Sequence, residues 1–140
     1  MTRRPVELQT DAAGQLRGVQ YHDGYMVTFT LSDGLTFGVR AIDNSLTEIV
    51  LTGVKMLCTD PLWEAAIVTD IDVWKAVDAP IRYWENLCQG RASAKGIKAD
   101  RARHLTKTPD GWIVEVGTAY GGGFTCLCAQ IDVFQTLPDA

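Results

Sequence analysis

The chain is poor in the residues and spacings on which most small metal sites and nucleophilic catalytic sites are built. It has 140 residues, of which two are histidine and four are cysteine, and no two cysteines have C-x-x-C spacing. Zinc sites and redox sites favour thiolates at that spacing, and the two histidines are too far apart to form a local ligand pair. We therefore expect no metal, no cofactor and no catalytic residue, and we interpret the cysteines as buried structural thiols.

Long apolar runs are missing as well. No stretch approaches the roughly 20 apolar residues of a membrane-spanning helix, and no apolar segment of a secretory signal follows the basic N-terminus. With 46% hydrophobic and 21% charged residues, the composition is that of an ordinary globular protein. We expect a cytoplasmic protein with a single domain over 1–140, in which residues 1–13 are frayed or add one edge strand.

Alternation of apolar and polar residues predicts a β-rich fold, and segment 27–39 shows it best. A two-residue turn at Asp33-Gly34 would place the two apolar rows of this hairpin on opposite faces. A three-residue loop with a left-handed Gly34 places them on one face, so we expect the second register. It pairs Leu31 with Leu35, Phe29 with Phe37 and Val27 with Val39.

Further strands are predicted over 15–21, 67–74, 112–116 and 124–134. Segment 46–58 fits helical spacing too, but its Ile, Val and Thr content favours a strand. One helix is predicted at about 78–90, capped by Asp78 and ended by Gly90. The fold class is therefore α+β and β-rich, an antiparallel rolled sheet or sandwich of about seven strands with this helix packed on it.

Segment 91–107 differs from the rest in charge. It carries a formal charge of +5, so the remainder carries −9 to reach the net −4 of the chain. A mobile surface loop and a short solvated helix both fit it, and its low apolar content favours a mobile basic loop.

Acidic residues gather on the predicted strand 67–74. Asp70 and Asp72 are two residues apart, so their side chains project on one face together with Trp74. Glu64 extends the acidic character of this region. Such carboxylates often serve only solubility, but next to an aromatic side chain they also resemble a protein-binding surface. Glu64, Asp70, Asp72 and Trp74 are our candidates for contact with a partner.

Three short pieces carry a resemblance to small β-rich bacterial proteins of immunity type or uncharacterised type. They are the strand Leu51-Thr52-Gly53-Val54, the run from Trp63 to Ile71, and the corner Thr118-Ala119-Tyr120-Gly121-Gly122 that leads to Cys128. The layout covers roughly residues 20–134. The resemblance implies a protein that binds and neutralises a partner toxin without catalysis, and it assigns no functional residue.

Two functions follow as hypotheses. The first is a non-catalytic binding protein, immunity-like, that presents an acidic and aromatic surface to a protein partner. The alternative is a small-molecule-binding domain or enzyme in which segment 91–107 closes over an anionic ligand. Its candidate residues are Arg91, Lys95, Lys98, Arg101, Arg103 and His104. A homodimer is compatible with either, whereas nucleic acid is not expected, because the basic segment lacks stacking aromatics and the remaining chain is acidic.

Overall fold

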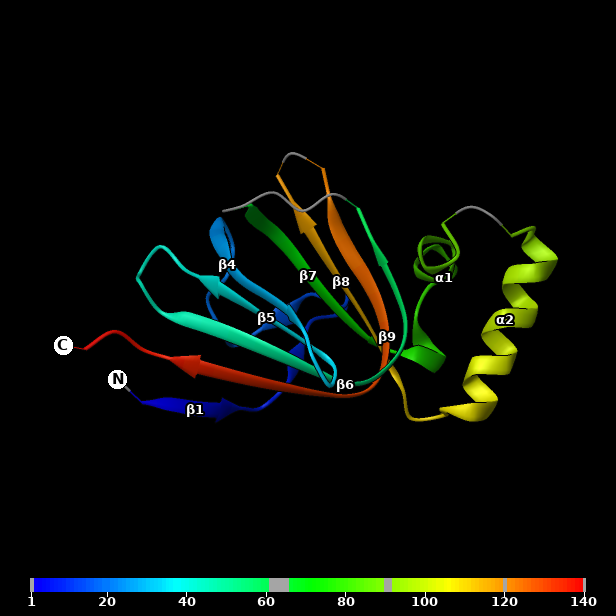
Figure 1. Cartoon of the computed structure of the whole chain (residues 1–140), viewed down its shortest axis with the longest axis horizontal. Coiled ribbons are helices and arrows are strands. Elements are labelled where there is room, and N and C mark those ends of the chain that lie inside the picture. Colours follow the sequence, from blue (N-terminus) through cyan, green and yellow to red (C-terminus); the bar gives the residue numbers. More distant parts are fainter. Residues whose placement is uncertain (1, 61–65, 90–91, 120, 140) are drawn as a thin grey trace.

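A closed barrel of six antiparallel strands forms the centre of the fold (Figure 1). The structure is a computed structural model that describes residues 2–60, 66–89, 92–119 and 121–139. Around the barrel the strands follow the order β9-β6-β5-β4-β7-β8, and β8 pairs again with β9. Their bounds are β4 Gly24–Leu31, β5 Leu35–Arg40, β6 Leu46–Thr59, β7 Ile67–Lys75, β8 Trp112–Thr118 and β9 Gly123–Thr136.

The α+β, β-rich class is confirmed, but the sheet closes into a barrel rather than forming a sandwich or an open roll. Closure depends on β6 and β9, which are 14 residues each and bend along their length. Gly53 takes a left-handed φ of 65°, and a bulge follows it between Val54 and Met56. Bulges increase the local twist and bend of a strand, which allows a sheet to curve onto itself. Segment 46–58 is thus a strand, as its composition favours.

Three short strands lie outside the barrel. β1 (Arg3–Val6) pairs with the C-terminal half of β9 and extends the sheet by one strand, while β2 (Gln9–Thr10) pairs only with β3 (Leu16–Arg17). The strand predicted over 15–21 is therefore wrong except at its beginning. Both termini lie at the end of the barrel opposite the helices (Figure 1).

The hairpin predicted over 27–39, formed by β4 and β5, has the predicted three-residue loop. Leu31 pairs with Leu35 and Phe29 pairs with Phe37, but Val39 pairs with Met26 rather than Val27. A bulge between Met26 and Thr28 shifts the register there. Gly34 has the expected positive φ, of 130°, and Asp33 before it also has a positive φ, of 52°. The second strand of the hairpin enters the core, while Leu31 remains 59% exposed.

The barrel interior is filled by apolar side chains from all six strands. Phe37 is fully buried and meets Phe124 edge to face, with 5.1 Å between the ring centroids. Cys126 and Cys128 are buried in the same interior, and a hydrogen bond to Cys128, together with burial, raises the pKa of the Cys126 thiol. The interpretation of the cysteines as buried thiols is confirmed for these two, whereas Cys58 and Cys88 are half-buried.

The helices differ from the prediction in number and position. The helix predicted at 78–90 is a 3-10 turn, η1 (Ala76–Asp78), followed by α1 (Ile81–Leu87). Pro80 is the N-cap residue of α1 and no side chain caps it, so Asp78 does not have the expected role. α1 packs on the outside of the barrel through Trp84, which belongs to a second core cluster together with the buried side chains of Ile113 on β8 and Leu127 on β9.

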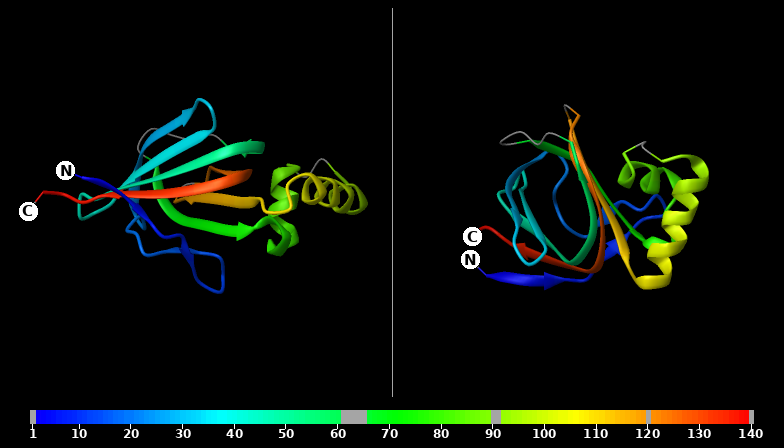
Figure 2. Two further views of the ribbon diagram at one scale, coloured as in Figure 1. Left: turned by 90° about the horizontal axis from the view of Figure 1, so that it is seen from below. Right: turned by 45° about the vertical axis from the view of Figure 1, so that its right-hand side comes forward.

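A second helix, α2 (Ala94–Lys107), stands where a mobile loop was predicted. The Ser93 side chain accepts a hydrogen bond from the Gly96 amide at 3.1 Å, which caps the helix, and alanines at three positions of the helix favour it. Capping and propensity thus outweigh the low apolar content. α2 lies on the far side of α1 from the barrel (Figure 2). No helix of the described residues is long and apolar enough to cross a membrane.

Candidate binding groove

An acidic groove of about 550 Å³ lies between α1 and the outer faces of the barrel strands. Strands β7, β8 and β9 form its floor, the end of β6 forms one side, and residues of α1 form the other. Its charged lining residues are Asp60, Asp70, Asp72, Glu85 and Glu115, with Arg82 as the cation.

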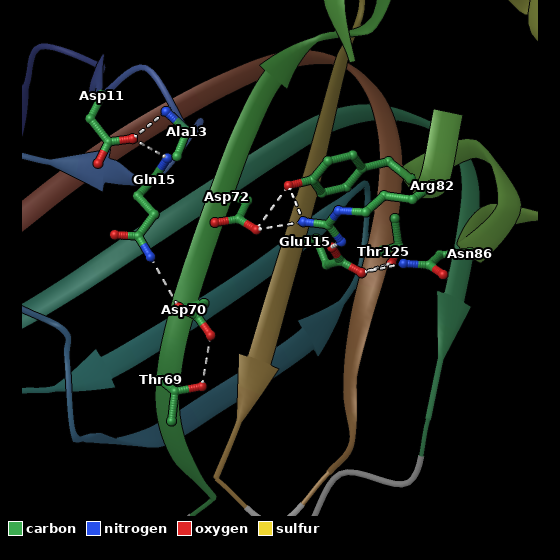
Figure 3. A network of polar contacts seen from close by, with 11 residues as sticks. Asp11, Ala13, Gln15, Thr69, Asp70, Asp72, Arg82, Asn86, Glu115 and Thr125 are labelled. Atoms are coloured by element: carbon green, nitrogen blue, oxygen red, sulfur yellow. Dashed lines mark hydrogen bonds and ion pairs between the residues drawn. The ribbon is translucent and has the colours of Figure 1, made fainter. Parts of the chain in front are cut away.

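A row of polar side chains crosses the floor at the level of Asp72. The strand register pairs Asp72 with Glu115, and Glu115 with Thr125. Because side chains alternate along a strand and Ile71 points into the barrel, all three of these residues point outward toward α1. Glu115 accepts hydrogen bonds from Asn86 Nδ2 at 2.6 Å and from Thr125 Oγ1 at 3.2 Å (Figure 3).

Arg82 of α1 neutralises this inner row. One guanidinium nitrogen lies 3.2 Å from Glu115 Oε2, and the other lies 3.6 Å from Asp72 Oδ2 and donates to the Tyr83 hydroxyl at 2.6 Å. The Tyr83 hydroxyl in turn donates to Asp72 at 3.0 Å. Two carboxylates thus share one cation, Asp72 also binds the phenol, and this network joins α1 to β7 and β8 (Figure 3).

Burial raises the pKa of Asp72, and the nearby carboxylates of Asp70 and Glu115 raise it further. The hydrogen bond from Tyr83 and the charge of Arg82 act in the opposite direction without cancelling the rise. The folded protein therefore holds the charged form of Asp72 less well than the unfolded chain does, and this cost is present at neutral pH.

The variant Asp72→Asn is accordingly expected to be slightly more stable than the wild type at pH 7, by less than about 1 kcal/mol because the site is partly solvated. A raised folded pKa means that the cost disappears as the pH falls through that pKa toward the unfolded value near 3.9. Urea unfolding at pH 7 and near pH 4 measures the difference, which should shrink at the lower pH. A less stable variant at pH 7 would mean that the ion pair with Arg82 outweighs the cost of burial.

The outer part of the groove is different, because its carboxylates have no cationic partner in the part of the chain that the structure describes. Within residues 2–60, 66–89, 92–119 and 121–139, no lysine, arginine or histidine forms an ion pair with Asp60, Asp70 or Glu85. All three residues are exposed. Asp70 accepts only neutral hydrogen bonds, from Gln15 Nε2 at 3.1 Å and from Thr69 Oγ1 at 3.1 Å.

Two glycines form the floor between these outer carboxylates. Gly117 pairs with Asp70 on one side and with Gly123 on the other, and the Asp60 amide donates to the Gly123 carbonyl at 3.0 Å. Three strand spacings, roughly 14 Å, therefore separate Asp70 from Asp60, and no side chain rises from the floor between them. The groove can admit a chain segment there.

Only part of the predicted acidic surface belongs to this groove. Asp70 and Asp72 line it, and Glu64 lies outside the described residues. Trp74 does not line it. Its half-buried indole packs against Gly14, where an added Cβ would overlap the ring, and lies 6.2 Å from the ring of Tyr83. The expected surface around Trp74 is thus a packing contact between the N-terminal segment and β7.

The sequence indicates Asp60 only as part of an acidic region, and sequence reasoning missed Glu85, Glu115 and Arg82 as groove residues. Glu115 carried a signal, since it is the only charged residue in the apolar strand 112–116. Glu85 and Arg82 are three residues apart on α1 and share a face, as i and i+3 positions of a helix do. Neither pattern alone indicates which strand faces which helix.

The basic candidate residues that the structure describes lie on α2, and none of these described residues lines the groove. Arg101 Nη2 donates to the Val77 carbonyl at 3.0 Å, and His104 stacks on Trp84 with 6.4 Å between ring centroids. Arg103 forms an ion pair with Asp100 at 2.6 Å. The side chains of Lys95 and Lys98 are exposed, and Arg91 lies outside the described residues. The packing of α2 gives no support to a lid over an anionic ligand.

No protein family, no curated protein and no solved structure matches the chain. The inner carboxylates of the groove, Asp72 and Glu115, are held by Arg82, and its outer carboxylates surround a floor without side chains. This arrangement is suited to hold a cationic group that comes from outside the chain.

Proposed function

We propose that the protein is a non-catalytic binding protein whose acidic groove takes a basic segment of a protein partner. The observation that carries this proposal is the division of charge in the groove. Arg82 forms ion pairs with the inner carboxylates Asp72 and Glu115. The outer carboxylates Asp60, Asp70 and Glu85 have no cationic partner among the described residues. Uncompensated carboxylates around one concave surface create a negative potential there, and a partner's lysine or arginine is attracted to it.

The groove is also suited to fast association. Its walls are strands and a helix, so it is formed before the partner arrives, and little ordering is needed on binding. A concave surface of one sign of charge attracts a partner of the opposite sign at long range. A toxin with a basic surface is one such partner, in keeping with the resemblance of the chain to immunity-type proteins.

The test uses a fluorescein-labelled oligolysine peptide as the probe and measures its anisotropy against the purified protein. We expect binding at low salt that weakens strongly near 1 M salt, where the Debye length is about 3 Å. The variant Asp70→Lys/Glu85→Lys should lose at least about tenfold in affinity, because two attractive contacts become repulsive. Asp72 is left in place because it is already bound by Arg82 and Tyr83 and is not one of the outer carboxylates.

A matched control separates groove binding from general attraction. The variant Glu7→Lys/Asp110→Lys replaces two exposed carboxylates outside the groove and, like the groove variant, raises the formal net charge from −4 to 0. It should bind the peptide nearly as the wild type does. If both variants lose affinity equally, the peptide responds only to overall charge, and the proposed groove function is wrong.

A further inference from the structure

The outward face of α2 carries the opposite charge to the groove. Lys95, Lys98 and Arg103 are exposed on this helix, and the exposed Ala99 and Ala102 lie between them. Successive positions on a helix turn by about 100°, which places these five residues opposite Ile97, the buried residue of α2. The face is therefore a basic surface with small side chains at its centre.

Of the three cations on this face, Arg103 has an acidic partner within the described residues, and the two lysines have none. The carboxylate of α2 is that of Asp100, which is half-buried at its edge. It binds Arg103 at 2.6 Å and accepts a hydrogen bond from the Cys88 thiol at 3.7 Å. Within the described residues, Lys95 and Lys98 form no ion pair.

The basic face cannot reach the groove of its own chain. α2 is held on the far side of α1 by Ile97, by the stack of His104 on Trp84 and by the bond from Arg101 to Val77 (Figures 1 and 2). The exposed face therefore points away from α1, whereas the groove lies between α1 and the barrel. The chain thus carries two complementary surfaces that can meet only between two molecules.

We propose that the outward face of α2 docks on the acidic groove of a second copy of this chain. The inference rests on the proposed function, since it names one occupant of the same groove. Lys95 and Lys98 of one copy would face the outer carboxylates Asp70 and Glu85 of the other, and Ala99 and Ala102 would let the helix backbone approach the rim. Because a residue on one surface contacts a different surface on its neighbour, the assembly is a reciprocal dimer or a longer chain.

Self-association of this kind has a regulatory consequence. A copy whose groove is occupied by α2 cannot take a basic partner at the same time. The oligolysine peptide should therefore compete with assembly, and raising the peptide concentration should return the protein to the monomer.

Charge reversal on each surface in turn tests the proposal. Sedimentation equilibrium at low salt should give a mass above the monomer for the wild type, and the monomer mass near 1 M salt. The variants Lys95→Glu/Lys98→Glu and Asp70→Lys/Glu85→Lys should each remain monomeric at low salt. Their equimolar mixture should assemble again, since the acidic helix of one then meets the basic groove of the other, and the basic helix meets the acidic groove. The control Glu7→Lys/Asp110→Lys should assemble as the wild type does.

Several outcomes would overturn the proposal. A monomeric wild type at low salt, assembly that survives in either reversal variant, or a mixture that stays monomeric would each do so. Failure here is distinguishable from failure of the groove function, because Lys95→Glu/Lys98→Glu keeps its groove intact. If that variant binds oligolysine while the wild type is monomeric, the groove function stands and the second copy is not its occupant.

Discussion

Alanine in place of Gly123 is expected to destabilise the protein by about 3 kcal/mol or more. Gly123 begins β9 at the floor of the groove with φ 143°, a conformation that side chains rarely adopt. A Cβ at this position would overlap the carbonyl oxygen of Val116 on β8. Backbone strain and overpacking each cost about 1–3 kcal/mol. The Val116 backbone cannot move away, because Val116 pairs with Phe124 where β8 and β9 close the barrel.

A second glycine of the same corner provides the control. Gly121 also has a positive φ, of 72°, but an added Cβ there has no atom within 4 Å. Gly121→Ala should therefore cost only the conformational strain, about 1–2 kcal/mol. Urea unfolding of both variants measures the difference. Equal losses would show that the corner can move away from the new methyl group, and that Val116 does not confine Gly123.

Local patterns predicted the strands well because their signal is contained in a few neighbouring residues. The loop at Asp33-Gly34 and the pairs on either side of it follow from turn chemistry and from the need to bury one face. The bulge after Met26 has no such signal. It depends on how β4 leaves β5 to meet β7, where only Gly24 and Tyr25 pair with the neighbouring strand.

Barrel closure and the second helix depended on information that local patterns lack. The barrel closes because β9 pairs with β6 along one edge and with β8 along the other. The alternation of residues within a strand does not specify which strands become its neighbours. For α2, the deciding features were the Ser93 cap and a run of helix-favouring residues. A helix with few apolar residues is stable here because its buried residue Ile97 packs in one cluster with Trp84 of α1, a contact that the segment itself does not reveal.

The groove was half predictable for the same reason. Asp70 and Asp72 could be placed on one face of one strand from their spacing alone. Glu115 and Arg82 join them through the register of β7 with β8 and through the docking of α1. These are contacts between residues 10 to more than 30 positions apart, so they belong to the assembled fold rather than to any segment.

Trp84 holds both helices, and its replacement by alanine is expected to cost about 3–5 kcal/mol, as for other large core aromatics. Its side chain is 1% exposed at the centre of the second core cluster, between the sheet residues Ile113 and Leu127 and the helix α2. The ring of His104 stacks on it from α2. Loss of Trp84 should therefore release α2 first, and hydrogen exchange in 94–107 should increase more than exchange in the barrel strands.

Two further variants decide whether this loss comes from packing volume. The indole Nε1 of Trp84 is buried without a hydrogen-bond partner within the described residues, so Trp84→Phe breaks no polar contact and should cost clearly less than Trp84→Ala. Ile81→Ala, at a position of α1 that is 45% exposed, should stay within about 0.5 kcal/mol of the wild type. Thermal unfolding ranks the three variants. If phenylalanine and alanine at position 84 are equally harmful, the indole nitrogen has a partner that packing alone does not explain, and the role of Trp84 as a filler between α1, α2 and the barrel is wrong.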